Sequence, residues 1–167
     1  MTGKNINKDI LTSLLVVFSI FLIDRFSKLY VILESQKSFD PNLFSSKYLN
    51  IYLTWNEGVA FGFFSFHDVF IYNILTILVS VIIIIIIFMI FKSDGIKKYS
   101  LLMILGGAVG NFYDRIFYKK VPDFIDFHIG DFHWFIFNVA DIFITIGIVC
   151  LIFVELFFNK EEKLNAK

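Results

Sequence analysis

The chain has 167 residues, of which 57% are hydrophobic and 19% aromatic, and its formal net charge at pH 7 is zero. Its mean hydropathy of +0.75 exceeds that of a soluble domain, and the balanced charge gives no basis for binding nucleic acid. Several apolar runs approach the length needed to cross a bilayer, so we expect one integral membrane domain over residues 1–167. The single cysteine, Cys150, excludes an intrachain disulfide and is interpreted as a small packed residue.

The first transmembrane helix is predicted over residues 10–33. Its apolar run continues through D-R-F-S-K without the small-residue cleavage site of a signal peptide. Asp24 and Lys28 are four positions apart, so they share a helical face and can pair. Two interpretations of this pair stay open: a polar helix end with a snorkelling lysine, or a charged pair that faces a polar site near the outer interface.

A small extramembrane β-cradle is predicted over residues 49–66. Between Asn50 and Asn56, polar and apolar side chains alternate with a period of two, which is typical of a half-buried strand. Gly58 and Gly62 indicate a tight bend or a close backbone approach. The aromatic residues of this segment suit the headgroup region of a membrane.

Three further spans are expected, at residues 69–91, 100–117 and 135–158. The run at 69–91 is rich in β-branched residues, but its 23 positions favour a membrane-spanning helix over a strand. Within 100–117, Gly106 and Gly110 have the small-xxx-small spacing that allows two helices to approach closely. The fold class is therefore an all-α polytopic membrane protein, with four transmembrane helices and the small extramembrane β-cradle.

The distribution of lysines predicts the orientation of the chain. If the N-terminus is cytoplasmic, four spans place eight lysines inside and four outside, which favours cytoplasmic termini. Polar residues from every part of the chain then gather near the outer face. Nine at one level exceed what packing needs: Asp24, Lys28, Asn56, Asn111, Asp114, Arg115, Asp123, Asn138 and Asp141.

Two carboxylates, Asp123 and Asp141, are the best candidates for chemistry. Asp141 lies about six residues inside the fourth predicted span, where a carboxylate is costly and is usually retained for function. The intervening segment is expected to be a loop that folds back and places Asp123 beside it. Two close carboxyls cannot both ionise easily, so one can take a proton from water while the other polarises an amide carbonyl.

Other chemistry is less well supported. No H-E-x-x-H, G-x-S-x-G or P-loop motif occurs. His128 and His133 lie five apart beside Asp131, but we interpret them as exposed loop histidines, so no metal and no cofactor is expected. A proton-coupled transporter and a non-catalytic scaffold stay open as alternatives. The transporter would need polar residues through the full depth of the bilayer, and the scaffold would not need nine at one level.

Four sequence blocks carry a resemblance: N-E-G-V-A-F-G at 56–62, G-G-A-V-G-N-F-Y-D-R at 106–115, V-P-D-F-I-D-F at 121–127 and F-N-V-A-D at 137–141. Together with the D-x-x-x-K of Asp24 and Lys28, they resemble the signature of the lipoprotein signal peptidases (signal peptidase II). The resemblance implies a four-helix aspartyl endopeptidase that cleaves prolipoproteins before a diacylglyceryl-modified cysteine. Pro122 departs from the family pattern, in which valine is frequent, and a proline cannot donate a backbone hydrogen bond.

The same resemblance implies partners and a location. The partners are diacylglyceryl-modified prolipoproteins, membrane lipids and globomycin-type inhibitors, with no nucleic acid, and the protein is expected to be a monomer. The location is the bacterial cytoplasmic membrane, with a multi-pass chain whose active site lies near the outer face.

The resemblance also implies a site, with Asp123 and Asp141 as the catalytic residues. The side chains of Asn111 and Asn138 are expected to orient them, and the guanidinium of Arg115 to bind substrate carbonyls. The full supporting set is Asp24, Lys28, Asn56, Gly58, Asn111, Asp114, Arg115, Asn138 and Ala140.

Several flanking residues have expected roles or alternatives. Trp55, Phe61 and Phe63 are expected over the lipid moiety, and the pair of Asp24 and Lys28 is expected to fix the first helix against the cradle. Asp114 can instead neutralise Arg115 or cap its turn. Asp126 is expected to face water in the loop.

Overall fold

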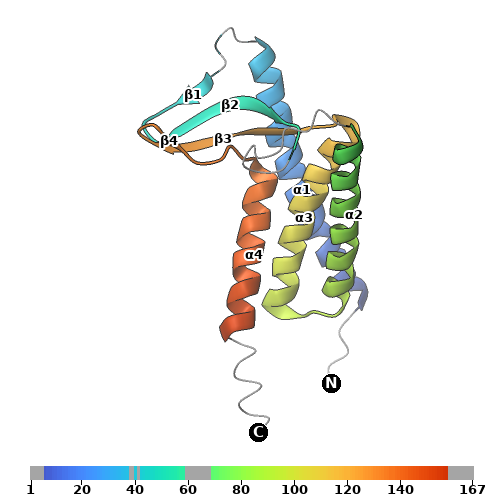
Figure 1. Cartoon of the computed structure of the whole chain (residues 1–167). Helices are drawn as coiled ribbons and strands as arrows, with labels where there is room; N and C mark the ends of the chain where they lie inside the picture. Colours follow the sequence, from blue (N-terminus) through green and yellow to red (C-terminus); the bar gives the residue numbers. More distant parts are fainter. Residues whose placement is uncertain (1–5, 38–39, 41, 59–68, 158–167) are drawn as a thin grey trace.

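The computed structural model describes residues 6–37, 40, 42–58 and 69–157. Within these residues, four helices form a bundle, and a four-stranded antiparallel sheet lies across one end of it (Figure 1). The helices are α1 (Ile6–Lys37), α2 (Val69–Phe91), α3 (Gly95–Phe117) and α4 (Val139–Phe157). The strands are β1 (Asn42–Ser45), β2 (Leu49–Asn56), β3 (Val121–Ile129) and β4 (Phe132–His133).

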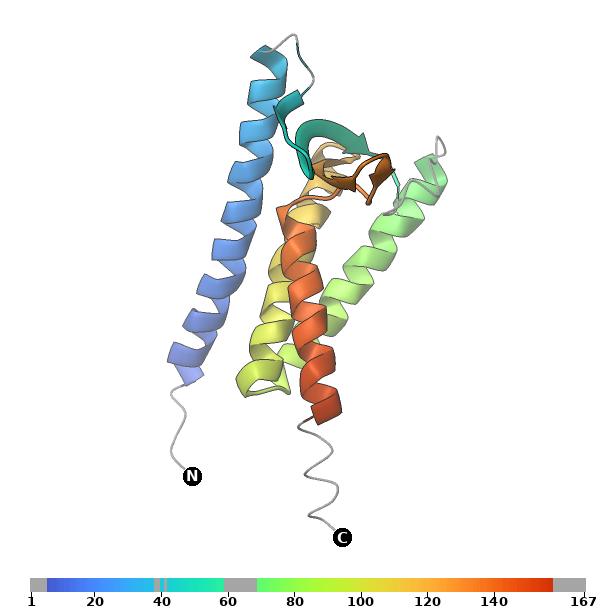
Figure 2. The ribbon, with the colours of Figure 1, turned by 90° about the vertical axis from the view of Figure 1, so that its left-hand side faces the viewer.

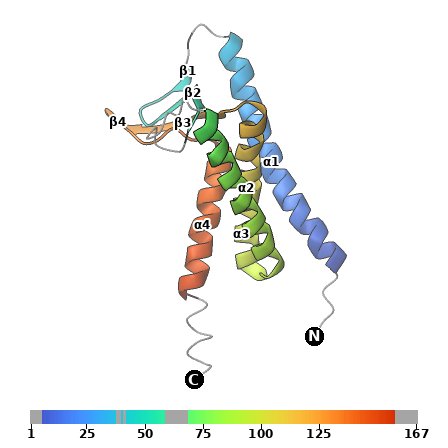
Figure 3. The same ribbon diagram turned by 45° about the vertical axis from the view of Figure 1, so that its right-hand side comes forward.

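Helix α3 is the centre of the bundle and packs against the other three helices. Its Leu101, Leu102 and Leu105 form an apolar core with Ile86 and Ile90 of α2. Figure 2 shows α2 diverging from α3 and α4 toward the sheet, and Figure 3 shows the N-terminal half of α1 diverging at the opposite end. The sheet and the polar end of α3 therefore lie at one end of the molecule.

Three of the four helices are long and apolar enough to cross a membrane: Ile6–Lys37, Tyr72–Phe91 and Val139–Phe157. Their outward faces expose many large aliphatic and aromatic side chains, as expected of surfaces in lipid. Helix α3, which was also expected to span, is long enough at 23 residues, but its most apolar stretch is less apolar than those of the other three helices. Its buried polar residues, Asn111 and Asp114, lower its hydropathy, and it packs against helices on three sides. The chain is thus a helical membrane protein, and its described residues contain three apolar span candidates.

Small residues allow α3 to approach its neighbours closely. A Cβ atom on Gly106 would lie 2.8 Å from Ile20 of α1, and one on Gly107 would collide with the carbonyl oxygen of Ala140 in α4. Gly110, four positions after Gly106, faces Asp24 of α1. The small-xxx-small spacing therefore marks the contact between α3 and α1, as the sequence indicated.

The sheet departs from the expected cradle. Strand β2 matches the predicted strand, with Asn50 opposite Asp126 and Thr54 opposite Asp123 in β3. The segment 121–134 was expected as a loop, but it forms β3 and β4, joined by a turn in which Gly130 has a φ of +60°. Most of β3 is buried on both faces, so its side chains lack the alternation that identifies a half-buried strand. Residues 59–66 of the predicted cradle lie outside the described residues.

Helix α4 begins four residues later than predicted, because residues 135–138 run back along β3. The backbone N–H groups of Phe124 and Ile125 donate to the carbonyl oxygen of Phe137, at 3.0 and 2.9 Å. The N–H of Phe137 in turn donates to the carbonyl oxygen of Ile125 at 3.0 Å. Because of this pairing, the chain returns from the end of the sheet to the bundle, and Asn138 lies beside Asp123.

Candidate active site

A reciprocal cap at the start of α4 holds Asp141. The side-chain oxygen of Asn138 accepts from the N–H of Asp141 at 3.2 Å, and the carboxylate of Asp141 accepts from the N–H of Asn138 at 3.1 Å. This is the capping-box arrangement, with asparagine and aspartate in the places of the usual serine and glutamate. Asp141 therefore lies in the first turn of the helix and not six residues inside it.

The same asparagine also reaches the second carboxylate. The Nδ2 of Asn138 donates to Asp123 at 2.6 Å, and the Nδ2 of Asn56 in β2 donates to the other oxygen of Asp123 at 2.9 Å. The backbone N–H of Gly58 donates to the side-chain oxygen of Asn56 at 3.0 Å, which fixes the orientation of that amide. Asn138 thus joins Asp123 and Asp141 through one side chain and its own backbone.

A third amide links Asp141 to a buried lysine. The Nδ2 of Asn111 in α3 donates to Asp141 at 2.8 Å, and its oxygen accepts from the Nζ of Lys28 at 2.8 Å. The ammonium of Lys28 also donates to Asp24 at 2.8 Å and to Asp114 at 2.7 Å, so all three of its N–H groups have acceptors. Lys28 is fully buried, so these three hydrogen bonds compensate for the loss of hydration of its charge.

Arg25 completes the charge balance of this network, and the sequence analysis missed it. Its Nη1 donates to Asp114 at 2.5 Å, and its guanidinium lies 5.0 Å from the ring centre of Tyr113. Two buried cations, Arg25 and Lys28, therefore face two buried carboxylates, those of Asp24 and Asp114. Nothing in the spacing along α1 indicates that Arg25 is buried, since both contacts come from α3.

The structure revises the expected role of the Asp24–Lys28 pair. The two side chains form an ion pair, as their spacing indicated. The second oxygen of Asp24 accepts from the backbone N–H of Ala140 at 2.9 Å, so the pair ties α1 to α4 and, through Lys28, to α3. It does not fix α1 against the cradle. Ala140 is fully buried at this contact.

The structure also corrects what was expected of Asp114 and Asp126. Asp114 has Arg25 and Lys28 as its partners, so it does not serve to neutralise Arg115. The Nη1 of Arg115 donates to the carbonyl oxygen of Asn111, and its buried Nε has no partner in the described part of the chain. Asp126 is fully buried and does not face water.

Of the three aromatic residues expected over the lipid moiety, Trp55 lies within the described residues. Trp55 lies 5.8 Å from the ring of Tyr118, and the ammonium of Lys120 lies 4.6 Å from its centre. Phe61 and Phe63 lie outside the described residues. Pro122 is fully buried opposite Trp55 in the sheet, so the strand accommodates the missing N–H.

The two aspartates differ in their environments. The pKa of Asp123 is raised from 3.8 to about 6 as the net result of several effects. Burial and then the negative charge of Asp141 raise it, while the amides of Asn56 and Asn138 and the charge of Lys28 lower it. Asp123 therefore keeps a proton to a higher pH than an ordinary aspartate, as expected for one member of a close pair of carboxyls.

An apolar cavity of about 680 Å³ lies beside Asp141. Its walls come from the β3–β4 hairpin, from residues 135–138 between this hairpin and α4, and from the first turns of α4. Aromatic and aliphatic side chains dominate the lining, and among the few polar residues are His128 and Asp141 itself. A cavity of this size and character suits an apolar group placed next to a carboxylate. Its lining includes Phe127, Phe132, Trp134, Phe135, Ile142 and Ile146.

Comparison with known proteins gives a consistent result over the whole chain. Residues 16–158 match the family described as Signal peptidase (SPase) II. The chain is 51% identical over 160 residues to the lipoprotein signal peptidase of Pelagibacter ubique (strain HTCC1062), covering 96% of each. It is 38% identical to that of Sulfurihydrogenibium sp. (strain YO3AOP1), covering 95% of this chain and 99% of the relative. A solved bacterial membrane enzyme aligns with a TM-score of 0.73 at 30% identity, covering 93% of this chain and 92% of that one.

Proposed function

Because the chain belongs to the signal peptidase II family and is a bacterial membrane enzyme that cleaves prolipoprotein signal peptides, we propose that Asp123 and Asp141 are its catalytic dyad. The observation that carries this assignment is the position of Asn138, which donates to both carboxylates. The family is one of aspartic peptidases, which need two carboxyls that share a proton. The amides of Asn56 and Asn111 hold the outer oxygens of the same pair.

We assign the shared proton to Asp123, because its pKa is raised to about 6. Asp141, the other member of the pair, then acts as the carboxylate. The carboxylate takes a proton from water as the water oxygen attacks the scissile carbonyl, and Asp123 gives its proton to the carbonyl oxygen. When the C–N bond breaks, the proton held by Asp141 goes to the leaving amine, and the hydroxyl of the tetrahedral carbon returns its proton to Asp123.

The apolar cavity supports a position for the lipidated end of the substrate. The diacylglyceryl group that marks the cleavage site is apolar, and Asp141 lies in the wall of the cavity. Filling the cavity would place the adjoining peptide bond beside the dyad and exclude bulk water from it, apart from the attacking water molecule. We assign the lipid-binding role to this cavity in place of Trp55, because Trp55 is engaged by Lys120 and Tyr118.

The dyad predicts a bell-shaped dependence of cleavage on pH. The active form carries one proton on the pair, so activity falls when the pair gains a second proton or loses the first. As the pH rises through about 6, Asp123 loses its proton in the free enzyme, so kcat/KM is expected to fall there. In the substrate complex, water is excluded and the corresponding limb of kcat lies at higher pH. Initial rates measured across pH at several substrate concentrations test this, and a kcat/KM that is flat between pH 5 and 8 would contradict it.

Arg115→Lys is expected to lower kcat/KM by about tenfold or more, although the charge is kept. Asp114 is already paired with Arg25 and Lys28, so the guanidinium of Arg115 is available to substrate carbonyls, and its planar fork is lost in lysine. Cleavage rates at matched protein levels provide the measurement. Lys97→Arg, a conservative exchange at the far end of α3, is the control. A wild-type rate in Arg115→Lys would remove Arg115 from the site.

We further propose that the chain is a single monomeric domain in which α3 also spans, so that both termini are cytoplasmic and the active site lies near the outer face. The lysine distribution supports this orientation. Inhibitors of the globomycin type would occupy the dyad and the cavity.

The orientation predicts which positions an impermeant thiol reagent reaches from outside. In a Cys150→Ser background, Asp131→Cys at the hairpin tip is expected to label in intact cells. Ser93→Cys, between α2 and α3, is expected to label only after the membrane is permeabilised. The reverse pattern would overturn the proposed topology.

A further inference from the structure

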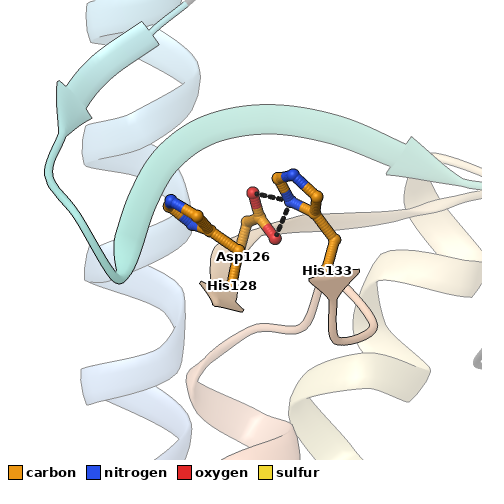
Figure 4. Close-up of side chains that lie close together, drawn as sticks. All are labelled: Asp126, His128 and His133. Atoms are coloured by element: carbon orange, nitrogen blue, oxygen red, sulfur yellow. Dashed lines mark hydrogen bonds and ion pairs between the residues drawn. The ribbon is translucent and has the colours of Figure 1, made fainter. Parts of the chain in front are cut away.

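A cluster of one carboxylate and two imidazoles lies on the sheet, apart from the dyad. Asp126 and His128 are two positions apart on β3, so their side chains share a face of the strand. His133 on β4 is the cross-strand partner of His128. Figure 4 shows the three side chains converging from the two strands. Both histidines were expected to be exposed loop residues, because the hairpin that brings them together was not predicted from the sequence.

The distances within the cluster are short. The Nδ1 of His133 lies 3.0 and 2.9 Å from the two oxygens of Asp126. The rings of His128 and His133 stack with their centres 4.9 Å apart and their planes at 17°. One nitrogen or oxygen from each of the three residues lies within 4.8 Å of the others. A cation bound at about 2.0–2.2 Å from each atom would need ligand atoms roughly 3.3 Å apart, so the two imidazole rings would have to rotate out of their present stack to direct a nitrogen at one ion.

We propose that Asp126, His128 and His133 bind a divalent transition-metal ion of the zinc class. Two imidazoles and one carboxylate are ligands that suit Zn²⁺ and its neighbours, whereas Ca²⁺ and Mg²⁺ favour sites made entirely of oxygen. Asp126 is fully buried, and the side chain of His133 is half-exposed, so the site combines a fixed anionic ligand with access from solvent. The ion would replace the hydrogen bond between Asp126 and His133.

A polar residue on the neighbouring strand organises these ligands. The Nδ2 of Asn50 in β2 donates to Asp126 at 3.1 Å and lies 3.3 Å from the Nδ1 of His128. The orientation of this amide is set by Ser45, whose hydroxyl donates to its oxygen at 2.7 Å. Partners of this kind position the carboxylate and imidazole ligands of metal sites. The carboxylate of Asp126 is thus held in place before an ion arrives, which reduces the entropy lost on binding.

An ion bound to this cluster would affect the wall of the apolar cavity. Both histidines belong to the β3–β4 hairpin, and His128 itself lines the apolar cavity beside Asp141. A bound ion would link the two strands of the hairpin and fix this wall of the cavity. The inference rests on the sheet alone and is independent of the proposed dyad.

Metal titration of the full chain tests the proposal directly. The protein is purified in detergent through a tag without histidines, stripped with a chelator and titrated with Zn²⁺ in a calorimeter. We expect one ion per chain. His133→Ala changes a half-exposed side chain and should fold normally, and it is expected to weaken binding at least tenfold. His128→Ala and Asp126→Asn are expected to do the same.

Matched variants separate this site from general metal binding by the chain. His67→Ala removes the third histidine of the sequence, and Asp131→Asn removes a carboxylate from the tip of the same hairpin. Both are expected to keep the wild-type affinity. In the wild type, Co²⁺ should give the visible absorption of a bound ion, and His133→Ala should lose it. The proposal is overturned if the wild type binds no ion, or if His128→Ala and His133→Ala both bind it as tightly as the wild type.

Discussion

Asp123→Asn and Asp141→Asn are each expected to lose nearly all prolipoprotein cleavage, by a factor on the order of 10³ or more, and the double variant is expected to be little worse than either. In each single variant the pair can no longer hold one proton and one negative charge at the same time. Residues that act as a unit are non-additive, because the first substitution already removes the shared function. Purified variants in detergent, assayed with a diacylated prolipoprotein, provide the measurement.

Controls for folding and stability distinguish a loss of catalysis from a loss of folded protein. Asparagine has nearly the same shape as aspartate, so both variants should accumulate in the membrane. The pKa of Asp123 is about 6 in the folded protein against an ordinary value of 3.8, so its ionised form is destabilising and the wild type gains stability as the pH falls through 6. Asp123→Asn avoids this penalty, so above pH 6 it should be at least as stable as the wild type, by up to about 3 kcal/mol. Asp131→Asn should keep full activity. Substantial turnover by either single variant would exclude that carboxylate from catalysis.

Lys28→Met is expected to destabilise the bundle by about 3–5 kcal/mol, because it leaves a buried negative charge without its partner. Lys28 is fully buried and donates to Asp24, Asn111 and Asp114, three acceptors that are themselves buried. Arg25 still neutralises Asp114, so the uncompensated charge falls mainly on Asp24. Thermal unfolding in detergent and the amount of protein in the membrane measure the effect.

A second substitution distinguishes lost charge balance from lost packing. Asp24→Asn added to Lys28→Met restores neutrality, so the double variant should recover a large part of the stability lost by Lys28→Met. Lys37→Met, which removes an exposed lysine paired with Glu34, should change stability by less than about 0.5 kcal/mol. If Lys28→Met unfolds at the same temperature as the wild type, then the buried network does not hold the helices together.

The sequence was most informative where a polar or charged residue lies beside a run of apolar residues. Asp123, Asp141 and Asn138 stood out as polar groups beside apolar runs, and the structure brings all three into one hydrogen-bonded group. Their catalytic role remains a prediction. The helical spacing of Asp24 and Lys28 likewise predicted an ion pair that the structure contains.

The sequence was less informative where long-range contacts decide the structure. Strand β3 was interpreted as a loop because it is buried on both faces and shows no alternation. The start of α4 was placed too early, because Phe137 pairs with Ile125 instead of entering the helix. The burial of Arg25 and Asp126 depends on partners from α3 and from the sheet, which no local pattern contains.

The bridge between Ile125 and Phe137 also shortens the loop that must close to bring the two carboxylates together. Asp123 and Asp141 are 18 residues apart, and the β3–β4 hairpin followed by this bridge closes that distance in two small loops. Small loops lose little chain entropy and form quickly. Lys28, in contrast, is 83 residues from Asn111, so its contact forms only when α1 docks. We therefore expect Asp123 and Asp141 to come together through short-range contacts, whereas the contact that joins Lys28 to Asn111 requires α1 to pack against α3.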